Sequence, residues 1–173
     1  MSSTSKLKKS DNLVSVIVTC FNYGMYLEDA LRSLAQQKYS PIEVIIIDDA
    51  STDETTIQIL SNLEQKYTEF HFYRVSHRGV EEARNFGIRK SRGSFICVLD
   101  ADDILDKSYI SECVSYLKEK PEVSIVTTFM KTFGEEDSSW NTGDFDVHRL
   151  CTQNLLHVSS LYRREVFDTV DGY

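Results

Sequence analysis

Short runs of aliphatic and β-branched residues alternate along this chain with stretches whose apolar residues recur every three or four positions. The runs predict five strands, at residues 13–20, 44–47, 71–75, 95–99 and 123–129. The recurring stretches predict four helices, at residues 27–35, 56–67, 83–88 and 110–117. Most of the strand runs are apolar at consecutive positions, which suits strands buried on both faces of a parallel sheet. We therefore expect an α/β fold, a three-layer α/β/α sandwich with a mostly parallel sheet.

The pattern weakens after the fifth strand. Residues 134–146 (GEEDSSWNTGDFD) are acidic and turn-rich and predict a loop. After them we expect a short helix, a strand and a further turn of helix, near residues 151–156, 159–162 and 164–169 respectively. We interpret residues 1–11 as a flexible polar tail and residues 12–173 as one domain. We expect this domain to be truncated at its C-terminus, because the chain stops at Asp171-Gly172-Tyr173 without a finished element.

Composition narrows the class of protein. The 173 residues carry a formal net charge of −8, which argues against a broad nucleic-acid-binding surface. No apolar run approaches the roughly 20 residues that span a bilayer, and no secretory signal is present, so we expect a cytoplasmic protein. The basic stretch at residues 6–9 could touch the inner face of an anionic membrane, although a solubilising tail explains it better. The four cysteines form no Cys-x-x-Cys pair, which disfavours a zinc site.

Two acidic clusters fall at the carboxyl ends of predicted strands. One is Asp48-Asp49 after VIII, and the other is Asp100-Ala101-Asp102-Asp103 after FICVL. Neighbouring carboxylates repel unless a positive charge neutralises them. If the chain stays extended, Asp100 and Asp102 point to the same side, and such a pair suits Mg²⁺ or Mn²⁺. Solvated loop residues or helix caps are the alternative, and the spacing leaves both open.

Polar and aromatic residues follow the first predicted strand at the same sheet edge. Thr19, Phe21 and Asn22 stand there, and Phe21 could stack on a nucleobase or pack in the core. Arg84, in the third predicted helix, could reach a diphosphate or orient Asp49, or it could be a surface or ion-paired residue. These residues are candidates for a binding site at the edge where the acidic clusters also lie.

Two expectations concern residues without assigned chemistry. Ser51 and Glu54 have the spacing of a capping box for the second predicted helix. The histidines at positions 71, 77, 148 and 157 lack the spacing of helical metal ligands, and we interpret them as structural.

Taken together, these segments resemble the family 2 glycosyltransferases of the GT-A fold, over residues 13–173. VSVIVTCFNYGMYLEDALRSLAQQ is similar to the family's first strand and helix, and EVIIIDDASTDET to its second strand and base-contacting turn. GVEEARNFGIRKSRGSFICVLDADDIL is similar to the stretch that ends in the metal-binding DxD motif. NLLHVSSLYRREVFDTVDGY is similar to the stretch that leads into the acceptor region.

The resemblance implies a donor site made of Thr19, Phe21, Asn22, Asp49, Arg84, Asp100 and Asp102. Within it, Thr19 and Phe21 would line a nucleoside pocket, and Asp49 would accept a hydrogen bond from the base, most commonly uracil. Asp102 and Asp103 would hold a divalent metal, Mn²⁺ or Mg²⁺. The donor would be a nucleotide-sugar, most commonly a UDP-sugar. Its sugar would pass with inversion to a hydroxyl of a carbohydrate or glycolipid acceptor, in polysaccharide or glycoconjugate synthesis.

The same resemblance leaves the catalytic base unnamed. The family's base is usually an acidic residue beyond the Gly-Gly-Phe-like turn, so we expect it beyond Tyr173. A donor-binding fragment without activity is therefore one alternative, and apolar surface left by a truncation could favour a homo-oligomer. A sugar-nucleotide nucleotidyltransferase is another, disfavoured because CFNYGMY holds one glycine and no basic residue. A receiver-like signalling domain is the third, disfavoured because the VTCFNY turn has no counterpart there.

Overall fold

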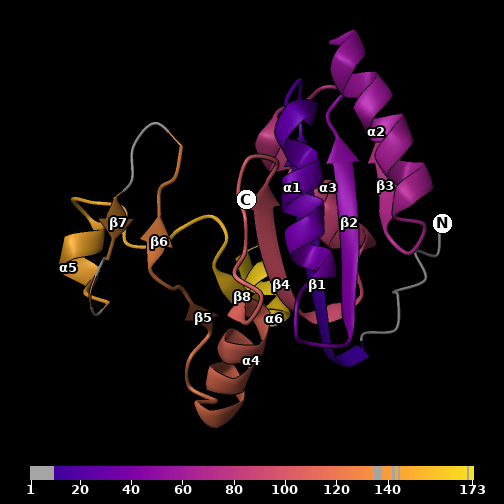
Figure 1. The fold of residues 1–173 in the computed structure, drawn as a ribbon. Helices are drawn as coiled ribbons and strands as arrows, with labels where there is room; N and C mark the ends of the chain where they lie inside the picture. The colour runs from indigo at the N-terminus through magenta and orange to yellow at the C-terminus, as the bar shows by residue number, and fades with distance from the viewer. Residues whose placement is uncertain (1–9, 135–137, 142, 144, 171) are drawn as a thin grey trace, which may run out of the picture.

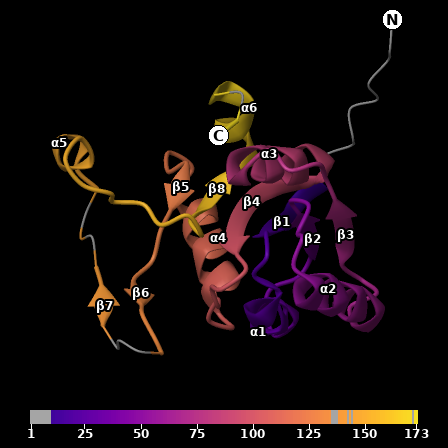
Figure 2. The same cartoon turned by 90° about the horizontal axis from the view of Figure 1, so that it is seen from above.

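The computed structural model describes residues 10–134, 138–141, 143, 145–170 and 172–173, which form a sheet covered on both faces by helices (Figures 1 and 2). Six strands form this sheet in the order β3-β2-β1-β4-β8-β5. Their bounds are β1 Ser10–Cys20, β2 Ile42–Asp48, β3 His71–Arg74, β4 Gly93–Asp100, β5 Ile125–Val126 and β8 Leu161–Arg163. The first four strands are parallel, and β8 runs antiparallel to both β4 and β5.

Helices cover the two faces of the sheet unequally. On one face lie α1 (Gly24–Ala35), α2 (Glu54–Lys66) and α4 (Tyr109–Glu119). On the other lie α3 (Val80–Lys90) and α6 (Arg164–Val170), as Figure 2 shows. The predicted three-layer α/β/α sandwich with a mostly parallel sheet is therefore confirmed.

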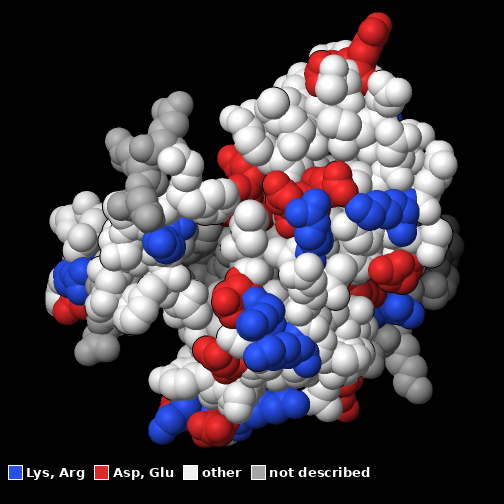
Figure 3. Space-filling view, viewed as in Figure 1, with Lys and Arg blue, Asp and Glu red and all other residues white. Residues whose placement is uncertain are grey.

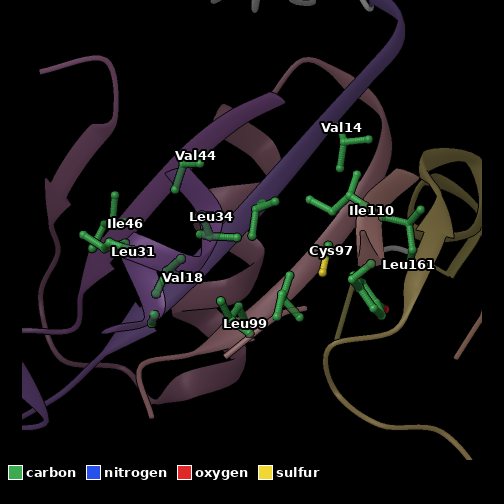
Figure 4. Packing of buried hydrophobic residues seen from close by; sticks show 14 of the residues in the cluster. Val14, Val18, Leu31, Leu34, Val44, Ile46, Cys97, Leu99, Ile110 and Leu161 are labelled. Carbon is green, nitrogen blue, oxygen red and sulfur yellow. The ribbon is translucent and has the colours of Figure 1, made fainter. Parts of the chain in front are cut away.

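The core explains why the central strands are apolar at consecutive positions. Successive side chains of a strand point to opposite faces, so a strand covered on both faces needs apolar residues at each position. In β1, Val16 and Val18 pack under α1, whereas Ile17 packs under α3. Figure 4 shows the first of these two clusters, in which β1 and β2 residues meet Leu31 and Leu34 of α1. Both layers are thus built from alternate residues of the same strands.

A glycine sets how closely α3 approaches the sheet. A Cβ atom added to Gly87 would lie 2.4 Å from the Cγ2 atom of Ile17. Any larger residue would push α3 away from β1, and α3 carries Arg84 toward the carboxyl ends of the strands. The backbone spacing at Gly87 therefore helps to place that arginine.

The later part of the chain departs from the predictions. In place of a strand over residues 123–129, only Ile125–Val126 (β5) pairs with the sheet, because its partner β8 is itself only three residues long. Next come β6 (Met130–Lys131), which precedes the region predicted as a loop, and β7 (Ser139–Trp140), which lies inside it; the two strands pair with each other. Figures 1 and 2 both show this hairpin as an arm beside the main sheet.

Two element boundaries were also predicted wrongly. The short helix is α5 (Val147–Leu150) rather than 151–156, because the Asp146 side chain caps it by accepting from the Arg149 N–H. β1 begins at Ser10, so the last two residues of the expected tail 1–11 belong to a strand. Residues 1–9, residues 135–137, 142 and 144 of the predicted loop, and Asp171 of the terminal turn lie outside the described residues. Among the helices of the described chain, none has the length and apolarity to cross a membrane.

Candidate functional site

A cleft of about 360 Å³ opens where the parallel strands β1, β2 and β4 end. It is lined by Thr19, Cys20, Phe21, Tyr23, Asp49, His77, Gly79, Val80, Ala83, Arg84, Asp100, Ala101 and Asp102. Ligands of open α/β sheets bind at this edge, beyond the carboxyl ends of the strands. Except for Asn22, the structure brings all the predicted donor-site residues together at this one cleft.

Asn22 lies beside the cleft and joins two turns. Its side-chain oxygen accepts hydrogen bonds from the backbone N–H groups of Thr52 (2.8 Å) and Asp53 (3.0 Å). Its own backbone N–H donates to Ser51 Oγ at 2.9 Å. Asn22 has a positive φ of 55°, a conformation that asparagine tolerates better than most residues. The residue therefore fixes the turn after β1 against the turn after β2.

The cap of α2 differs from the predicted capping box. Asp53 is the N-cap residue, and its carboxylate accepts from the Thr56 N–H at 2.8 Å. Ser51 does not cap this helix, because its hydroxyl accepts from Asn22 and its N–H donates to Asp48. The prediction of Ser51 with Glu54 as a capping box was therefore wrong.

The two aspartates of the first acidic cluster face different surroundings. Asp48 lies outside the cleft, where its carboxylate accepts from the Ser51 N–H at 2.8 Å and lies 3.5 Å from Arg74 Nε. Asp49 lines the cleft and is buried. Its carboxylate accepts from the N–H groups of Arg78 (3.0 Å) and Gly79 (3.1 Å). Asp49 therefore fixes the start of α3 against the end of β2.

Arg84 pairs with Asp100 across the cleft. Its Nη2 atom lies 2.9 Å from Asp100 Oδ1, and the Thr19 hydroxyl donates to the same oxygen at 3.4 Å. The arginine is largely buried, with 14% of its side chain exposed, and its Nε has no hydrogen-bond partner among the described residues. Of the roles raised for Arg84, ion pairing is observed and contact with Asp49 is not. The largely buried guanidinium of Arg84 is therefore paired with the carboxylate of Asp100, the last residue of β4.

The chain turns after Asp100 and does not stay extended. The Asp103 N–H donates to the Asp100 carbonyl at 3.1 Å, which closes a turn. As a result Asp102 is exposed in the cleft, whereas Asp103 lies in a neighbouring cavity with its Oδ2 atom 3.8 Å from His157 Nε2. The chain is therefore not extended through Asp102, as the prediction required, although Asp100 and Asp102 both line the cleft.

Three carboxylates lie close together along this turn. Burial raises the pKa of the Asp103 carboxyl above its usual value, and the charges of Asp100 and Asp102 raise it further, while His157 acts in the opposite direction. In the described part of the chain, no three ligand-type side chains already converge on one point. Mg²⁺ commonly binds through one or two carboxylates and completes its shell with substrate phosphates and water. The exposed Asp102 carboxylate in the cleft fits that mode of binding.

His77, which the sequence led us to interpret as structural, also lies at this cleft. The His77 ring lines the cleft and stacks on Phe21, with ring centroids 4.4 Å apart and an interplanar angle of 26°. Phe21 is 42% exposed, so it is not a core residue. The available signal was position, because His77 follows the carboxyl end of β3, which parallel pairing places at the same sheet edge.

Charged side chains on the face shown in Figure 3 are mixed in sign. On the helices that cover this sheet, Arg32 lies 2.9 Å from Asp29 on α1, and Lys66 of α2 lies 2.6 Å from Glu28. Exposed pairs of this kind contribute little to stability, because water screens them. On this face of the described chain, basic side chains therefore lie beside acidic ones.

Comparison with known proteins gives one family. Residues 15–170 match the family model described as glycosyl transferase family 2. Glycosyltransferase GlyG of Streptococcus pneumoniae serotype 4 is 29% identical over 149 residues, which cover 84% of this chain and 49% of GlyG. Chondroitin synthase of Escherichia coli is 24% identical over 165 residues, covering 93% of this chain and 24% of that protein. The chain thus spans about half the length, or less, of these curated relatives.

Solved structures share the fold. The S. aureus TarS 1–349 complex with UDP-GlcNAc superposes with a TM-score of 0.74 at 22% identity, covering 91% of this chain and 47% of that one. The mannosyltransferase PcManGT of Pyrobaculum calidifontis, in complex with GDP-Man and Mn²⁺, superposes with a TM-score of 0.70 at 22% identity. The match covers 92% of this chain and 47% of that one. At this identity the likeness establishes the α/β fold alone.

Proposed function

Since the chain belongs to glycosyl transferase family 2, we propose that its cleft binds a nucleotide-sugar donor, a UDP-sugar. In the parent protein, the hexosyl or N-acetylhexosaminyl group passes with inversion to a hydroxyl of a carbohydrate or glycolipid acceptor, in polysaccharide or glycoconjugate synthesis. One observation carries the proposal. A single cleft at the carboxyl ends of β1, β2 and β4 holds an exposed aromatic ring, a buried arginine and an exposed carboxylate.

Each of these groups suits one part of such a donor. Phe21 presents an exposed ring, and base–aromatic stacking of this kind contributes about 1–3 kcal/mol. Arg84 places a positive charge near the turn that would face the diphosphate, and Asp100 holds its guanidinium in place. The TarS structures with UDP and UDP-GlcNAc, and PcManGT with GDP-Man, support a nucleoside diphosphate sugar as the ligand class.

A divalent cation, Mn²⁺ or Mg²⁺, belongs to the same proposal. Asp102 lines the cleft as an exposed carboxylate, and Asp103 is the next carboxylate along the turn. Bound there, the cation supplies positive charge to a leaving diphosphate. The Mn²⁺ complex of PcManGT supports this assignment. We assign no catalytic base among the described residues, so the transfer reaction is proposed for the parent protein.

Calorimetric titration with UDP, with and without Mn²⁺, tests the proposal. We expect the wild-type chain to bind UDP and Mn²⁺ to strengthen that binding. Asp102→Ala should weaken UDP binding in Mn²⁺ by about tenfold or more, or about 1.4 kcal/mol, and should abolish the response to the metal. Asp29→Ala is a matched control, because Asp29 is an exposed aspartate of α1 that pairs with Arg32 outside the cleft.

Two results would contradict the proposal. If wild type and Asp102→Ala bind UDP equally and Mn²⁺ changes neither, the metal and donor assignment is wrong. If Asp29→Ala weakens UDP binding as much as Asp102→Ala does, the loss comes from the change in net charge and not from the removal of a ligand in this cleft.

A further inference from the structure

The neighbouring cavity that holds Asp103 has a volume of about 340 Å³. Its walls come from the turn after β4, the start of α4, residues 127–133 around β6, and the segment before β8. Figures 1 and 2 both show β6 and β8 on the side of β4 away from β1. Asp102 lines the donor cleft and Asp103 lines this cavity, so a single step along the chain separates the two. A molecule bound here would therefore lie beside the proposed donor.

His157 and Asp103 face each other in this cavity without a hydrogen bond. The Ser159 backbone N–H donates to His157 Nδ1 at 3.2 Å, so Nδ1 carries no hydrogen. In the neutral imidazole the hydrogen is then on Nε2. This Nε2 lies 3.8 Å from Asp103 Oδ2, which is too long for a hydrogen bond. The cavity thus presents one donor and one acceptor, held apart by the fold.

The turn at residues 157–160 fixes this arrangement. The Ser160 N–H and the Ser160 hydroxyl both donate to the His157 carbonyl, at 3.0 and 2.6 Å. Ser159 lines the cavity with 6% of its surface exposed. Its hydroxyl lies close enough to Asp103 to lower the pKa of that carboxyl, yet Ser159 Oγ has no partner of hydrogen-bond geometry among the described residues. Buried hydroxyls without a partner are uncommon, so this wall of the cavity retains polar capacity.

Aromatic rings and carboxylates in the lining indicate the kind of ligand. Phe129 and Phe133, before and after β6, are exposed and line the cavity, and a flat apolar ring suits the C–H face of a sugar. Asp103 and Asp106 line it as well, which disfavours a negatively charged ligand. Lys131 also contributes to the walls, and it already interacts with another group of the chain. Flat apolar surface beside hydrogen-bonding groups suits a neutral saccharide better than a hydrocarbon chain.

We propose that this cavity binds a neutral sugar unit of the acceptor, and that one hydroxyl of this unit accepts from His157 Nε2 and donates to Asp103. The inference rests on the proposed function, whose acceptor must approach the donor's sugar. A hydroxyl is the group that both accepts and donates, and its oxygen can reach two atoms 3.8 Å apart at ordinary hydrogen-bond distances. Asp103 then serves the acceptor, while the cation of the donor site depends on Asp102 and the donor's phosphates.

Titration with simple glycosides, followed by the amide signals in proton–nitrogen NMR spectra, tests the inference. The probes are the methyl glycosides of glucose, galactose, mannose, N-acetylglucosamine and N-acetylgalactosamine, with glycerol as a control polyol. We expect at least one glycoside to bind with a dissociation constant in the millimolar range and to shift the amide signals of Asp103 and Ser159. It should do so with UDP and Mg²⁺ present as well as without them. Glycerol should cause no saturable shift.

Variants on both sides of the gap separate a bound hydroxyl from general effects. Asp103→Ala removes the acceptor and should raise the dissociation constant of that glycoside about tenfold or more. His157→Phe keeps a ring but lacks the Nε2–H, and it should weaken binding to a similar extent. His157→Gln restores an N–H donor and should recover part of the affinity. Asp29→Ala, an exposed change on α1, should bind the glycoside as wild type does. Urea denaturation of each variant accompanies the titrations.

The outcomes are distinguishable from those for the proposed function. If no glycoside of the panel binds, or if Asp103→Ala and His157→Phe bind as tightly as wild type, the inference is wrong, and UDP binding decides the donor site separately. If UDP with Mg²⁺ abolishes glycoside binding, the cavity belongs to the donor and the inference is overturned. If the chain binds a glycoside but not UDP, the donor site is wrong and the assignment of this sugar to an acceptor falls with it.

Discussion

The two ends of the central strands carry polar clusters of opposite character. The amino-end cluster consists of Ser15, Glu43, Arg92, Gly93 and Arg164, and the carboxyl-end cluster consists of Asp49, Arg84, Asp100, Asp102 and Asp103. Both clusters place charge beside the same apolar sheet. They differ in whether the chain itself satisfies that charge.

The amino-end cluster is satisfied internally. Glu43 accepts hydrogen bonds from the Ser15 hydroxyl and from the backbone N–H groups of Arg92 and Gly93, and its second oxygen lies 3.3 Å from Arg92 Nε. Arg164, which begins α6, donates to the carbonyl groups of Gly93 and Ile88 and to the Ser91 hydroxyl. This cluster binds α6 and the start of β4 to the rest of the sheet.

The carboxyl-end cluster is not satisfied in the same way. Arg84 Nε lacks a partner among the described residues, and Asp102 is exposed. The pKa of Asp103 is raised by burial and by its acidic neighbours. Charge arranged in this way lowers stability but favours a charged ligand that enters later. One cluster therefore holds the fold together, and the other lies where we propose that the donor binds.

The largest expected effect is at the amino end. Glu43→Ala should lower the free energy of unfolding by about 2–4 kcal/mol, because Ser15 and two backbone N–H groups lose their buried acceptor. Urea denaturation followed by circular dichroism measures this change. UDP binding by the folded protein should stay at the wild-type value, since the cluster lies at the far end of the strands.

Glu43→Gln is the matched control for that prediction. Its side-chain oxygen can still accept from Ser15 and the two N–H groups, so it should lose clearly less stability than the alanine variant. Equal losses in the two variants would mean that packing, and not the hydrogen bonds, determines the effect. No loss in Glu43→Ala would contradict the interpretation of this cluster as structural.

An intermediate effect should appear as acid destabilises the fold. Burial alone would raise the pKa of Glu43, but the hydrogen bonds from Ser15 and Arg92 and the Arg92 charge outweigh it, so this pKa lies below its usual value. A depressed carboxyl pKa stabilises the fold above the unfolded value and loses that contribution as pH falls through the folded value. Wild type should therefore lose more stability between about pH 5 and pH 3 than Glu43→Gln does. If the free energies of unfolding of wild type and Glu43→Gln fall in parallel with pH, the ionisation of Glu43 does not contribute to acid destabilisation.

The smallest expected effect is an increase in stability, on substitution of Asp103. Since the pKa of Asp103 is raised, its ionisation destabilises the fold; this penalty begins above the unfolded pKa and is complete above the folded one. Because water screens a carboxylate that is 36% exposed, the effect should be small, and Asp103→Asn should raise the melting temperature at pH 7 by about 1–2 °C. Scanning calorimetry at pH 7 measures it. A lower melting temperature would show that the contact with His157 outweighs the repulsion.

The chain sequence determined the layered fold because its signals are local. Consecutive apolar residues at 13–20 and 95–99 specify strands covered on both faces, and the helical periodicity between them requires crossover helices. Parallel strands then bring their carboxyl ends to one edge, so Phe21, Asp49 and Asp100 could be predicted to meet. The prediction was weaker after residue 123, where strands of two or three residues depend on partners far along the chain.

The tertiary structure alone determined which partners the site residues contact. Arg84 turned out to pair with Asp100, Asp103 turns away from Asp102 into a neighbouring cavity, and Asn22 joins two loops beside the cleft. The same holds for His77, whose position against Phe21 depends on where β3 ends relative to β1. The physical reason is range: burial pattern and periodicity act between neighbours in sequence, whereas hydrogen-bond partners and burial of a charge depend on which strand ends the sheet places side by side.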